Sequence, residues 1–360
     1  MKHGDETFQM SLFTHIRSVQ DATITLMHNV YEHLENTNSS VRVLFVDFSS
    51  AFNTIQNHLL ITKLISMNVN HNLIAWIYSY MSNRSQYVKL NQVKSDIVIT
   101  NTGAPQGCVL SPILFTLYTN DCKSKFDHCK VVKYADDTAI IGQIFNDDHG
   151  DYLDQVDDFV IWCDQNYLNL NVKKTKEMVF DFRKNRSVLS ELVIKSETVE
   201  RVHDYKYLGI VIDDKLSGSQ NSQLVYSKCM QRVHHLRLLR NINIDCKILT
   251  LLYKSIIESI LCFSITTWYG NISCQNKNKF KKIVRISCKL GADVTVLQDL
   301  YNRYTLDQMK KIMKDEKHPL NNRYIFLRSG RRLALPKIKT TRYKNSFIPS
   351  SIKLYNHLHN

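Results

Sequence analysis

Two apolar segments that carry carboxylates constrain the fold of this chain most. The run VRVLFVDF, residues 41–48, is β-branched and apolar, which predicts a buried strand with Asp47 at its end. Because side chains alternate along a strand, Asp47 shares a face with every second residue before it. The run VVKYADDTAIIG, residues 131–142, has two apolar arms around a polar tip, which predicts a β-hairpin with Asp136 and Asp137 at the turn.

Helical and strand patterns alternate in the rest of the first half. Helical spacing of apolar residues predicts helices over 18–35, 57–68, 71–82 and 148–167, and a further helix after the glycine at 107. Apolar runs predict strands at 176–182 and 205–213. From about residue 220 the chain is mainly helical and basic. The pattern therefore predicts a mixed half followed by a helical half, which is an α+β organisation.

The basic charge lies wholly in the second half. The chain has 47 Lys and Arg against 33 Asp and Glu, a formal net charge of +14. Residues 1–180 hold 14 basic and 19 acidic side chains, whereas residues 181–360 hold 33 basic and 14 acidic ones. A half-chain this positive indicates a polyanionic partner, either nucleic acid or an anionic membrane, with a solvated basic surface as the alternative.

Cysteine usage and the N-terminal residues bear on the compartment. Nine cysteines occur at scattered spacings without a C-x-x-C pair, which disfavours a zinc ribbon and is typical of a reducing compartment. The first residues lack the apolar run of a signal peptide. We therefore expect an intracellular protein, in the cytoplasm or the nucleus, that is not secreted and has no membrane partner.

The three carboxylates are candidate metal ligands. An Asp at the end of a buried strand costs free energy unless it is paired or binds a cation, and the adjacent Asp136 and Asp137 repel each other unless a cation offsets the repulsion. Brought together with Asp47, they would form an oxygen-rich site suited to Mg²⁺. Each has a local alternative: Asp47 as the N-cap of a following helix, and Asp136 and Asp137 as an ordinary turn.

A third segment, NTGAPQGCVLSP at 101–112, interrupts regular structure. Its glycines and first proline break any regular element, and Ser111 and Pro112 then begin a helix, where Pro suits the first turn. A glycine-rich bend lets the backbone approach a ligand closely, and Gln106 offers both a donor and an acceptor there. Taken alone, this loop is more typical of an ordinary turn.

The order of the segments is more specific than any one of them. FVDFSSAF, GAPQGCVLSP and YADD follow one another and closely resemble the reverse transcriptase family, in its non-LTR (LINE-type) retrotransposon branch. LNLNVKKTKEMVF, YKYLGIVID, WYGN and HPLNNRYIFLRSGRRL continue the resemblance in order, so that it covers nearly the whole chain from about Arg17. It implies a right-hand polymerase palm with partial fingers in residues 1–215, a helical thumb-like domain in 216–300 and a basic C-terminal segment in 301–360.

The resemblance also implies an activity, RNA-directed DNA polymerisation with two Mg²⁺ or Mn²⁺ ions. Its partners would be an RNA template, a DNA primer and dNTPs. Asp47, Asp136 and Asp137 would be the catalytic, metal-binding carboxylates, with Lys174 near the leaving pyrophosphate and Lys173 and Lys176 as rivals. The residues implied to contact substrate are Phe48, through its carbonyl, Phe52 as a steric gate, Gln106, Gly107 and Tyr134.

Local alternatives remain for two of these, because Phe52 and Tyr134 are also typical core aromatics. YLGI would form the primer-grip hairpin. The second half would hold primer and template through phosphates. The residues implied for this contact are Arg232, Arg237, Arg240, Lys281, Lys282, Arg285, Arg331 and Arg332. Interleaved aromatics (Tyr253, Phe263, Trp268 and Tyr269) could stack on bases, although a place in the helix core is the simpler interpretation.

The pattern departs from the family before the first strand. Only about forty residues precede Asp47, fewer than a complete fingers region, and residues 1–13 fit no motif. We therefore expect an N-terminally truncated member with fingers largely missing. The alternative to an active polymerase is a catalytically inactive retroelement remnant that binds nucleic acid. An RNA-templated RNA polymerase is disfavoured by the YADD tip and by Phe52.

Overall fold

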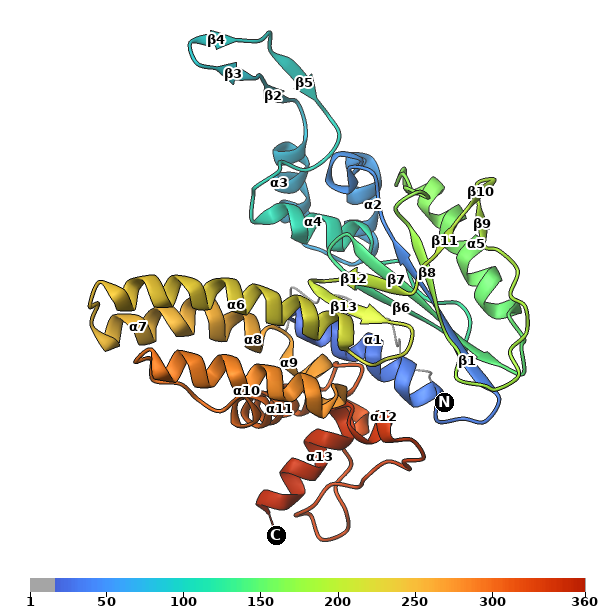
Figure 1. Cartoon of the computed structure of the whole chain (residues 1–360). Helices are drawn as coiled ribbons and strands as arrows, with labels where there is room; N and C mark the ends of the chain where they lie inside the picture. The colour runs from blue at the N-terminus through green and yellow to red at the C-terminus, as the bar shows by residue number, and fades with distance from the viewer. Residues whose placement is uncertain (1–16, 360) are drawn as a thin grey trace.

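A five-stranded sheet forms the centre of the N-terminal half (Figure 1). The computed structural model describes residues 17–359. The strand order is β11-β8-β1-β7-β6, and every pairing is antiparallel except that of β11 with β8. The strands are β1 (Ser39–Val46), β6 (Cys129–Tyr134), β7 (Asp137–Phe145), β8 (Lys176–Phe180) and β11 (Glu200–Arg201). The strands expected at 41–48 and 176–182 and the hairpin expected at 131–142 are thus confirmed.

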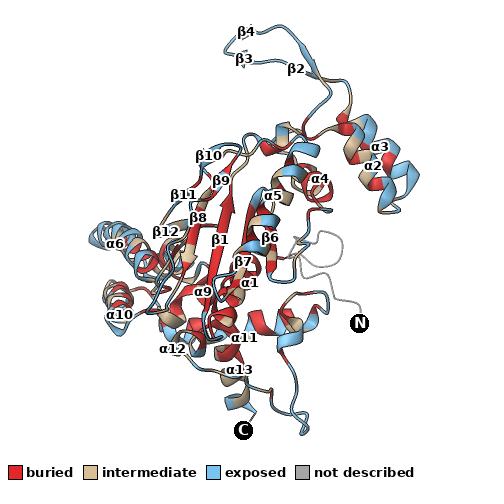
Figure 2. Cartoon of the chain, turned by 90° about the vertical axis from the view of Figure 1, so that its right-hand side faces the viewer, coloured by how far each residue is buried: buried red, intermediate tan, exposed pale blue. Residues whose placement is uncertain are grey.

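β1 is buried along its whole length because both faces of the sheet are covered (Figure 2). On one face, Leu44 and Val46 share a core cluster with residues of α4 (Leu110–Tyr118) and α5 (Gly150–Gln165). On the other face, Val43 and Phe45 share a cluster with α1 (Val19–His33). A strand covered on two sides needs apolar side chains at odd and even positions alike, which explains the continuous apolar run at residues 43–46.

Two further helices and a projecting arm follow β1. After a short turn, η1 (Ala51–Asn53), come α2 (Asn57–Ser66) and α3 (His71–Met81) at the expected positions. The chain then runs outward as a narrow ladder in which β2 pairs with β5 and β3 with β4 (Figure 1). Its strands are β2 (Arg84–Gln86), β3 (Lys89–Leu90), β4 (Val93–Lys94) and β5 (Val98–Thr100). We name residues 84–100 the β arm.

A separate hairpin lies against the sheet near the end of β1. It consists of β12 (Asp204–Tyr207) and β13 (Ile210–Asp213), which pair in antiparallel fashion. Leu208 and Gly209 form its two-residue turn, and both have positive φ angles, +46° and +88°, as a type I′ turn requires. The hairpin expected for YLGI is therefore confirmed. The single strand predicted over 205–213 is wrong, because the turn at Leu208 and Gly209 divides that segment into two paired strands. A small two-stranded ladder, β9 (Val193–Ile194) with β10 (Glu197–Thr198), precedes it.

The second half is helical, as expected. Its longest helix, α6, runs side by side with α10 (Figure 1). The elements are α6 (Ser219–Asn241), α7 (Cys246–Tyr253), η2 (Lys254–Glu258), α8 (Ser259–Cys262), α9 (Ile265–Trp268), η3 (Tyr269–Asn271), α10 (Cys274–Lys289), α11 (Leu297–Lys314), η4 (Asn321–Arg323), α12 (Thr341–Lys344) and α13 (Phe347–Leu358).

One core cluster joins the two halves. It contains residues of α1, of β1 and of the helices from α6 to α12. α1 contacts the sheet as well as α9, α12 and α13, so almost all of its side chains are buried. The domain limits 1–215, 216–300 and 301–360 remain predictions. In residues 17–359 no single helix could cross a membrane by length and apolarity; only the bent pair Cys246–Cys262 and Ile265–Asn271 meets both criteria together.

Candidate active site

Strand register brings Asp47 and Asp137 to the same edge of the sheet. β1 and β7 are antiparallel, with Phe45 opposite Ala139 and Val46 opposite Thr138. The next position, Asp47, therefore falls opposite Asp137. Cross-strand neighbours in an antiparallel pair point to the same face, so the two carboxylates share the face that carries Phe45. The expected meeting of these segments, remote in sequence, is present in the fold.

The turn between β6 and β7 places Asp136 and Tyr134 beside Asp47 and Asp137. Ala135 adopts a left-handed conformation, with φ of +54°, and Asp136 follows it as an exposed residue at the tip. Tyr134 pairs with Asp137 across the hairpin and is half-buried against the core that contains Phe45. Tyr134 is thus a packed hairpin aromatic beside the carboxylates, and its contact with substrate stays a prediction.

The carboxylates influence one another electrostatically. Desolvation by the surrounding protein, and then the negative charges of Asp136 and Asp47, raise the pKa of Asp137 to about 6. Burial raises the pKa of Tyr205 on β12, and the charges of Asp137 and Asp47 add to this. The Tyr205 ring stacks on Phe45, with ring centroids 4.3 Å apart. The hairpin β12–β13 therefore lies directly beside the carboxylates.

The backbone of residues 47–49 is held by the segment 169–175. The Asp47 N–H donates to Thr175 Oγ1 at 3.2 Å, and the Asp47 carbonyl accepts from the Asn171 N–H at 2.9 Å. The Ser49 N–H donates to the carbonyl of Asn169 at 2.8 Å. The interpretation of Asp47 as a helix N-cap is wrong, because η1 begins only after Ser50 and no side chain caps it. Segment 169–175 thus positions Asp47.

The same segment carries the three rival lysines. Lys176 Nζ donates to the carbonyl of Lys173 and to Glu200 Oε2, both at 2.6 Å. Lys173 and Lys174 are exposed, and neither forms an ion pair within the described part of the chain. The ion pair with Glu200 leaves Lys176 the least available of the three for a phosphate. Lys174 remains a candidate, with Lys173 as its rival.

The glycine-rich loop packs on the segment that follows Asp47. The Gly103 N–H donates to the carbonyl of Ile55 at 2.8 Å, and the Ala104 N–H to that of Phe52 at 2.7 Å. Gly103 has φ of +73°, and a Cβ there would lie 2.7 Å from Asn53 Cα, so this close approach requires glycine. The loop thus approaches the backbone of residues 52–55 closely at Gly103.

Gln106 and Gly107, further along the same loop, are exposed to solvent. Gln106 is exposed, and its Nε2 donates to Asn53 Oδ1 at 3.2 Å. Gly107 has φ of +78°, and a Cβ added there would meet no atom within 4 Å. Ser111 Oγ donates to the carbonyl of Pro105 at the start of α4. The loop therefore leaves open space at Gly107 next to the segment that begins with Asp47.

The two phenylalanines after Asp47 are part of the packing. Phe48 forms a β-bridge with Leu170, and its ring centroid lies 6.3 Å from that of Phe159 on α5. Phe52 is half-buried on η1, with its ring centroid 5.2 Å from that of Phe115 on α4. Phe52 is therefore anchored to the core while its remaining surface stays accessible, an arrangement compatible with both roles considered for it.

The donor set suits a hard divalent cation. Mg²⁺ prefers carboxylate oxygens and is commonly bound by one or two of them together with water and substrate phosphates. The repulsion that contributes to the raised pKa of Asp137 is what a cation would offset. Across residues 17–359, however, no group of three or more His, Cys, Asp or Glu side chains is arranged to hold a metal ion by itself.

The eight basic residues expected to contact nucleic acid are all exposed. Those of the first two groups lie on the neighbouring helices α6 and α10, and those of the third lie on the loop before α12. Lys279 Nζ of α10 donates to Gln223 Oε1 of α6 at 3.3 Å, which joins the two helices. The groups are Arg232, Arg237 and Arg240; Lys281, Lys282 and Arg285; and Arg331 and Arg332.

Comparison with known proteins identifies the class. A family model described as "Reverse transcriptase (RNA-dependent DNA polymerase)" matches residues 3–212, more than half of the chain. The chain belongs to this family, whose members use divalent metal ions. Its mixed sheet and the helical half that follows are consistent with the palm and thumb of the expected fold. The match begins at residue 3, so the start of the resemblance expected at about Arg17 was too late. Residues 1–13, which were expected to fit no motif, lie outside the part of the chain that the structure describes. A second model, "Alkylated DNA repair protein alkB homolog 8, N-terminal", matches only residues 219–259.

Curated relatives indicate that the chain belongs to the non-LTR (LINE-type) branch of the reverse transcriptase family. Similar proteins from Drosophila melanogaster are the RNA-directed DNA polymerase from mobile element jockey, 28% identical, and probable RNA-directed DNA polymerases from transposon BS, 23%, and from transposon X-element, 22%. These matches cover 73%, 72% and 84% of this chain but 30%, 30% and 34% of the relatives, so the chain spans about a third of their length.

Solved structures that match this chain include a telomerase. A telomerase from Candida tropicalis, in complex with a fragment of telomeric RNA, is 12% identical with a TM-score of 0.43. The match covers 84% of this chain and 51% of the telomerase.

Proposed function

We propose that this chain supplies the polymerase centre of an RNA-directed DNA polymerase, which joins a dNTP to the 3′-OH of a DNA primer on an RNA template. The observation that carries the proposal is the meeting of Asp47 with Asp136 and Asp137 at one sheet edge, inside the region matched by the reverse transcriptase family. These segments lie about ninety residues apart along the chain, yet the register of β1 and β7 aligns them.

The three carboxylates, with the backbone carbonyl of Phe48, would hold two Mg²⁺ or Mn²⁺ ions. Such ions lower the pKa of an attacking hydroxyl and stabilise a leaving pyrophosphate. The protein contributes position: segment 169–175 fixes the backbone of Asp47, and the hairpin turn fixes Asp136 and Asp137. Positioning of the reactants and electrostatic stabilisation supply most of the rate enhancement in phosphoryl transfer.

The substrate would lie on the residues around these carboxylates. Gln106 and Gly107 would contact the incoming nucleotide and the template, and the open space at Gly107 supports this placement. The ring of Phe52 would exclude a ribose 2′-OH, while Tyr134 would lie near the primer terminus. Lys174 would be near the pyrophosphate. The basic residues of α6, α10 and the loop before α12 would bind primer and template phosphates, independently of sequence.

Primer extension on an RNA template with dNTPs and Mg²⁺ tests the proposal. Asp136→Asn should lower the extension rate at least about 10³-fold, because it removes a metal-binding charge from a small set. Asp127→Asn is a matched control, since Asp127 is an exposed aspartate that forms no ion pair in the described chain.

The outcomes separate the two functions considered. Extension by wild type and by Asp127→Asn, but not by Asp136→Asn, supports the polymerase. If wild type binds primer–template with a steep salt dependence but extends nothing, the polymerase proposal fails, and the chain acts as a nucleic-acid-binding remnant instead. Equal extension by all three proteins would show that the carboxylates at the sheet edge are not catalytic.

A further inference from the structure

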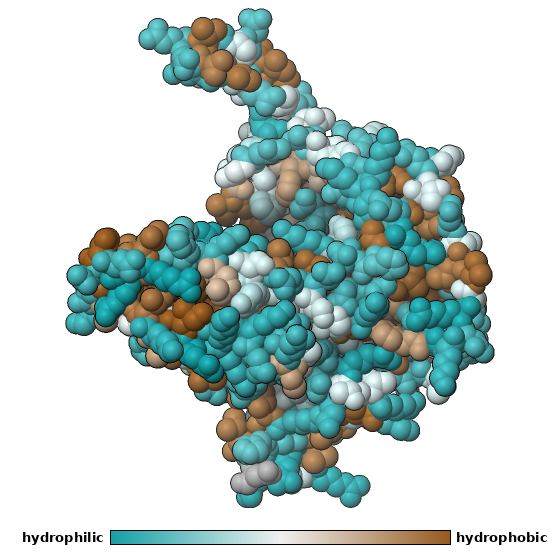
Figure 3. All heavy atoms as spheres, in the orientation of Figure 1, coloured by the Kyte–Doolittle hydropathy of each residue, from teal (hydrophilic) through white to brown (hydrophobic). Residues whose placement is uncertain are grey.

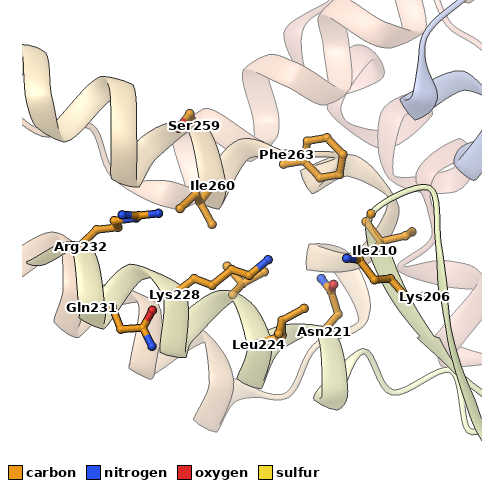
Figure 4. Close-up of a pocket in the computed structure, with 12 residues that line it drawn as sticks. Lys206, Ile210, Asn221, Leu224, Lys228, Gln231, Arg232, Ser259, Ile260 and Phe263 are labelled. Atoms are coloured by element: carbon orange, nitrogen blue, oxygen red, sulfur yellow. The ribbon is translucent and has the colours of Figure 1, made fainter. Parts of the chain in front are cut away.

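A groove separates the hairpin β12–β13 from the helical half (Figure 4). Its volume is about 640 Å³. The hairpin supplies one wall, α6 supplies the second, and α8 with the residue after it supplies the third. Three of its lining side chains are cationic (Lys206, Lys228 and Arg232) and one is aromatic (Phe263). The others are aliphatic (Ile210, Leu224, Val225 and Ile260), polar and uncharged (Asn221, Gln231 and Ser259), or glycine (Gly209).

The cations of the groove have no acidic partners. Lys228 and Arg232 are four positions apart on α6 and therefore lie on the same side of the helix. Lys206 approaches from β12 on the opposite wall (Figure 4). All three are exposed, and within residues 17–359 none forms an ion pair with Asp or Glu. Three uncompensated positive charges around one groove favour an anionic ligand.

Phe263 is the exposed aromatic of this groove. Its exposed fraction is 46%, whereas Tyr253, Trp268 and Tyr269, from the same part of the chain, are buried. Core packing, the simpler interpretation of all four aromatics, therefore fails for Phe263. A ring left in water beside three cations presents an unused flat surface to a ligand.

The ring of Phe263 is held in place from two sides. The Phe263 carbonyl accepts a hydrogen bond from Trp268 Nε1 at 3.1 Å, which fixes its backbone. On the other side the ring lies against the turn of the hairpin: a Cβ at Gly209 would come within 2.9 Å of Phe263 Cε1. A preordered ring of this kind loses little conformational freedom when a ligand stacks on it.

We propose that this groove binds an unpaired nucleotide of a single-stranded nucleic-acid segment, with its base stacked on Phe263 and adjacent phosphates bound by Lys206, Lys228 and Arg232. The inference rests on the proposed function, because it adds a base-stacking subsite to the nucleic-acid surface of the same protein. An aromatic platform flanked by cations is how single strands are bound without sequence preference. An acidic peptide would use the cations but would leave the flat ring without a stacking partner.

The test compares oligonucleotides that differ only in their bases. Twelve-residue dT and rU strands are measured against abasic strands with the same number of phosphates, at one salt concentration, by fluorescence anisotropy. Stacking should make wild type bind an intact strand about tenfold more tightly than the abasic one. The DNA and RNA arms show which sugar the groove accepts. Equal affinity of wild type for intact and abasic strands of both kinds overturns the proposal without any mutation.

Variants assign the preference to the ring. Phe263→Leu keeps an apolar side chain but lacks a flat surface, so it should bind intact and abasic strands equally. Phe326→Leu is the matched control, since Phe326 is also 46% exposed but lies outside the groove; it should keep the tenfold preference. A preference retained by Phe263→Leu places the stacking site elsewhere and overturns the proposal, as does complete displacement of the strand by polyglutamate at matched charge.

The cations should act differently from the ring. Lys228→Gln and Arg232→Gln should each weaken binding of intact and abasic strands alike and lower the salt slope by about one, while the preference for intact strands persists. Primer extension by Asp136→Asn and wild type judges the proposed function independently. If wild type extends the primer but binds intact and abasic strands equally, the proposal for the groove fails while the proposed polymerase function stands.

Discussion

At the residue scale, the position of Asp47 depends on the register of β1 with β7 and on single hydrogen bonds from segment 169–175. Alternation within 41–48 predicts the face on which Asp47 lies, and the pattern of 131–142 predicts that Asp137 lies at a hairpin turn. The register of β1 with β7 brings the two carboxylates to one face. The bonds from Asn171 and Thr175 to the backbone of Asp47 have no periodic signature. The segment LNLNVKKT was recognised only through its resemblance, and its role in positioning Asp47 came from the structure.

A buried ion pair beneath the sheet also escaped the sequence pattern. Arg42 lies within the apolar strand β1, yet its side chain is almost fully buried, with Nη2 2.6 Å from Glu177 Oε1 on β8. Tyr152 donates to the same oxygen at 3.0 Å, and Arg201 Nε donates to Glu177 Oε2 at 3.0 Å. One arginine in an otherwise apolar run does not reveal its partner, which lies 135 residues further along the chain.

This network gives a stability prediction. Glu177→Gln leaves the guanidinium of Arg42 buried without a counter-charge, so the free energy of unfolding should fall by about 3–5 kcal/mol. Glu197→Gln, at an exposed position on β10, should change it by less than about 0.5 kcal/mol. Urea unfolding followed by circular dichroism measures both. Similar midpoints for the two variants would mean that the pair contributes nothing to stability.

At the element scale, long periodic segments were predicted well and short strands were not. The helices at 57–68 and 71–82 and the strand at 176–182 agree with α2, α3 and β8 to within a few residues. The β arm was not predicted, because its strands are only two or three residues long and provide too few positions for alternation to show.

The end of the β arm exposes apolar side chains without a covering element (Figure 3). Val88, Leu90 and Val93 are each about three-quarters exposed (72%, 73% and 73%). Contiguous apolar groups on unpaired strand edges promote association. Replacing the three with Thr should reduce self-association at rising protein concentration, measured by sedimentation velocity. The melting temperature should stay unchanged, because these side chains contribute little to the core.

A control separates contiguity from simple apolar content. Val188, Ile242 and Leu358 are comparably exposed but scattered over the molecule, with exposed fractions of 101%, 67% and 65%. Their triple replacement by Thr should leave self-association as in wild type. If both triple variants associate equally less, then total exposed apolar surface, rather than the arm, governs association.

At the scale of the whole molecule, the division of charge follows the division of structure. The acidic first half supplies four of the five strands of the sheet, with its carboxylate edge, and the basic second half supplies β11 and the helices beside the sheet. The sequence predicted this division but not the continuous core across it, because α1 at the start of the chain packs against α9, α12 and α13 from its end. Packing between such distant segments is set by the tertiary structure and leaves no local signal.

The arrangement of the basic groups predicts how binding depends on salt. The basic residues of the first two groups lie on the neighbouring helices α6 and α10, whereas Arg331 and Arg332 lie on the loop before α12, here called the C-terminal loop. We expect a short nucleic acid to reach only the two helices. On a short primer–template, the triple change of Lys281, Lys282 and Arg285 to Gln should flatten the plot of log affinity against log salt by about two to three units, roughly one for each phosphate that the variant no longer neutralises. The change of Arg331 and Arg332 to Gln should leave that slope unaltered and flatten it only on a longer template.

Because phosphate binding is independent of sequence, both effects should be the same for unrelated templates. Titrations at four salt concentrations with two template lengths decide the matter, and an equal effect of the arginine pair on both lengths would show that the C-terminal loop belongs to the same surface as α10.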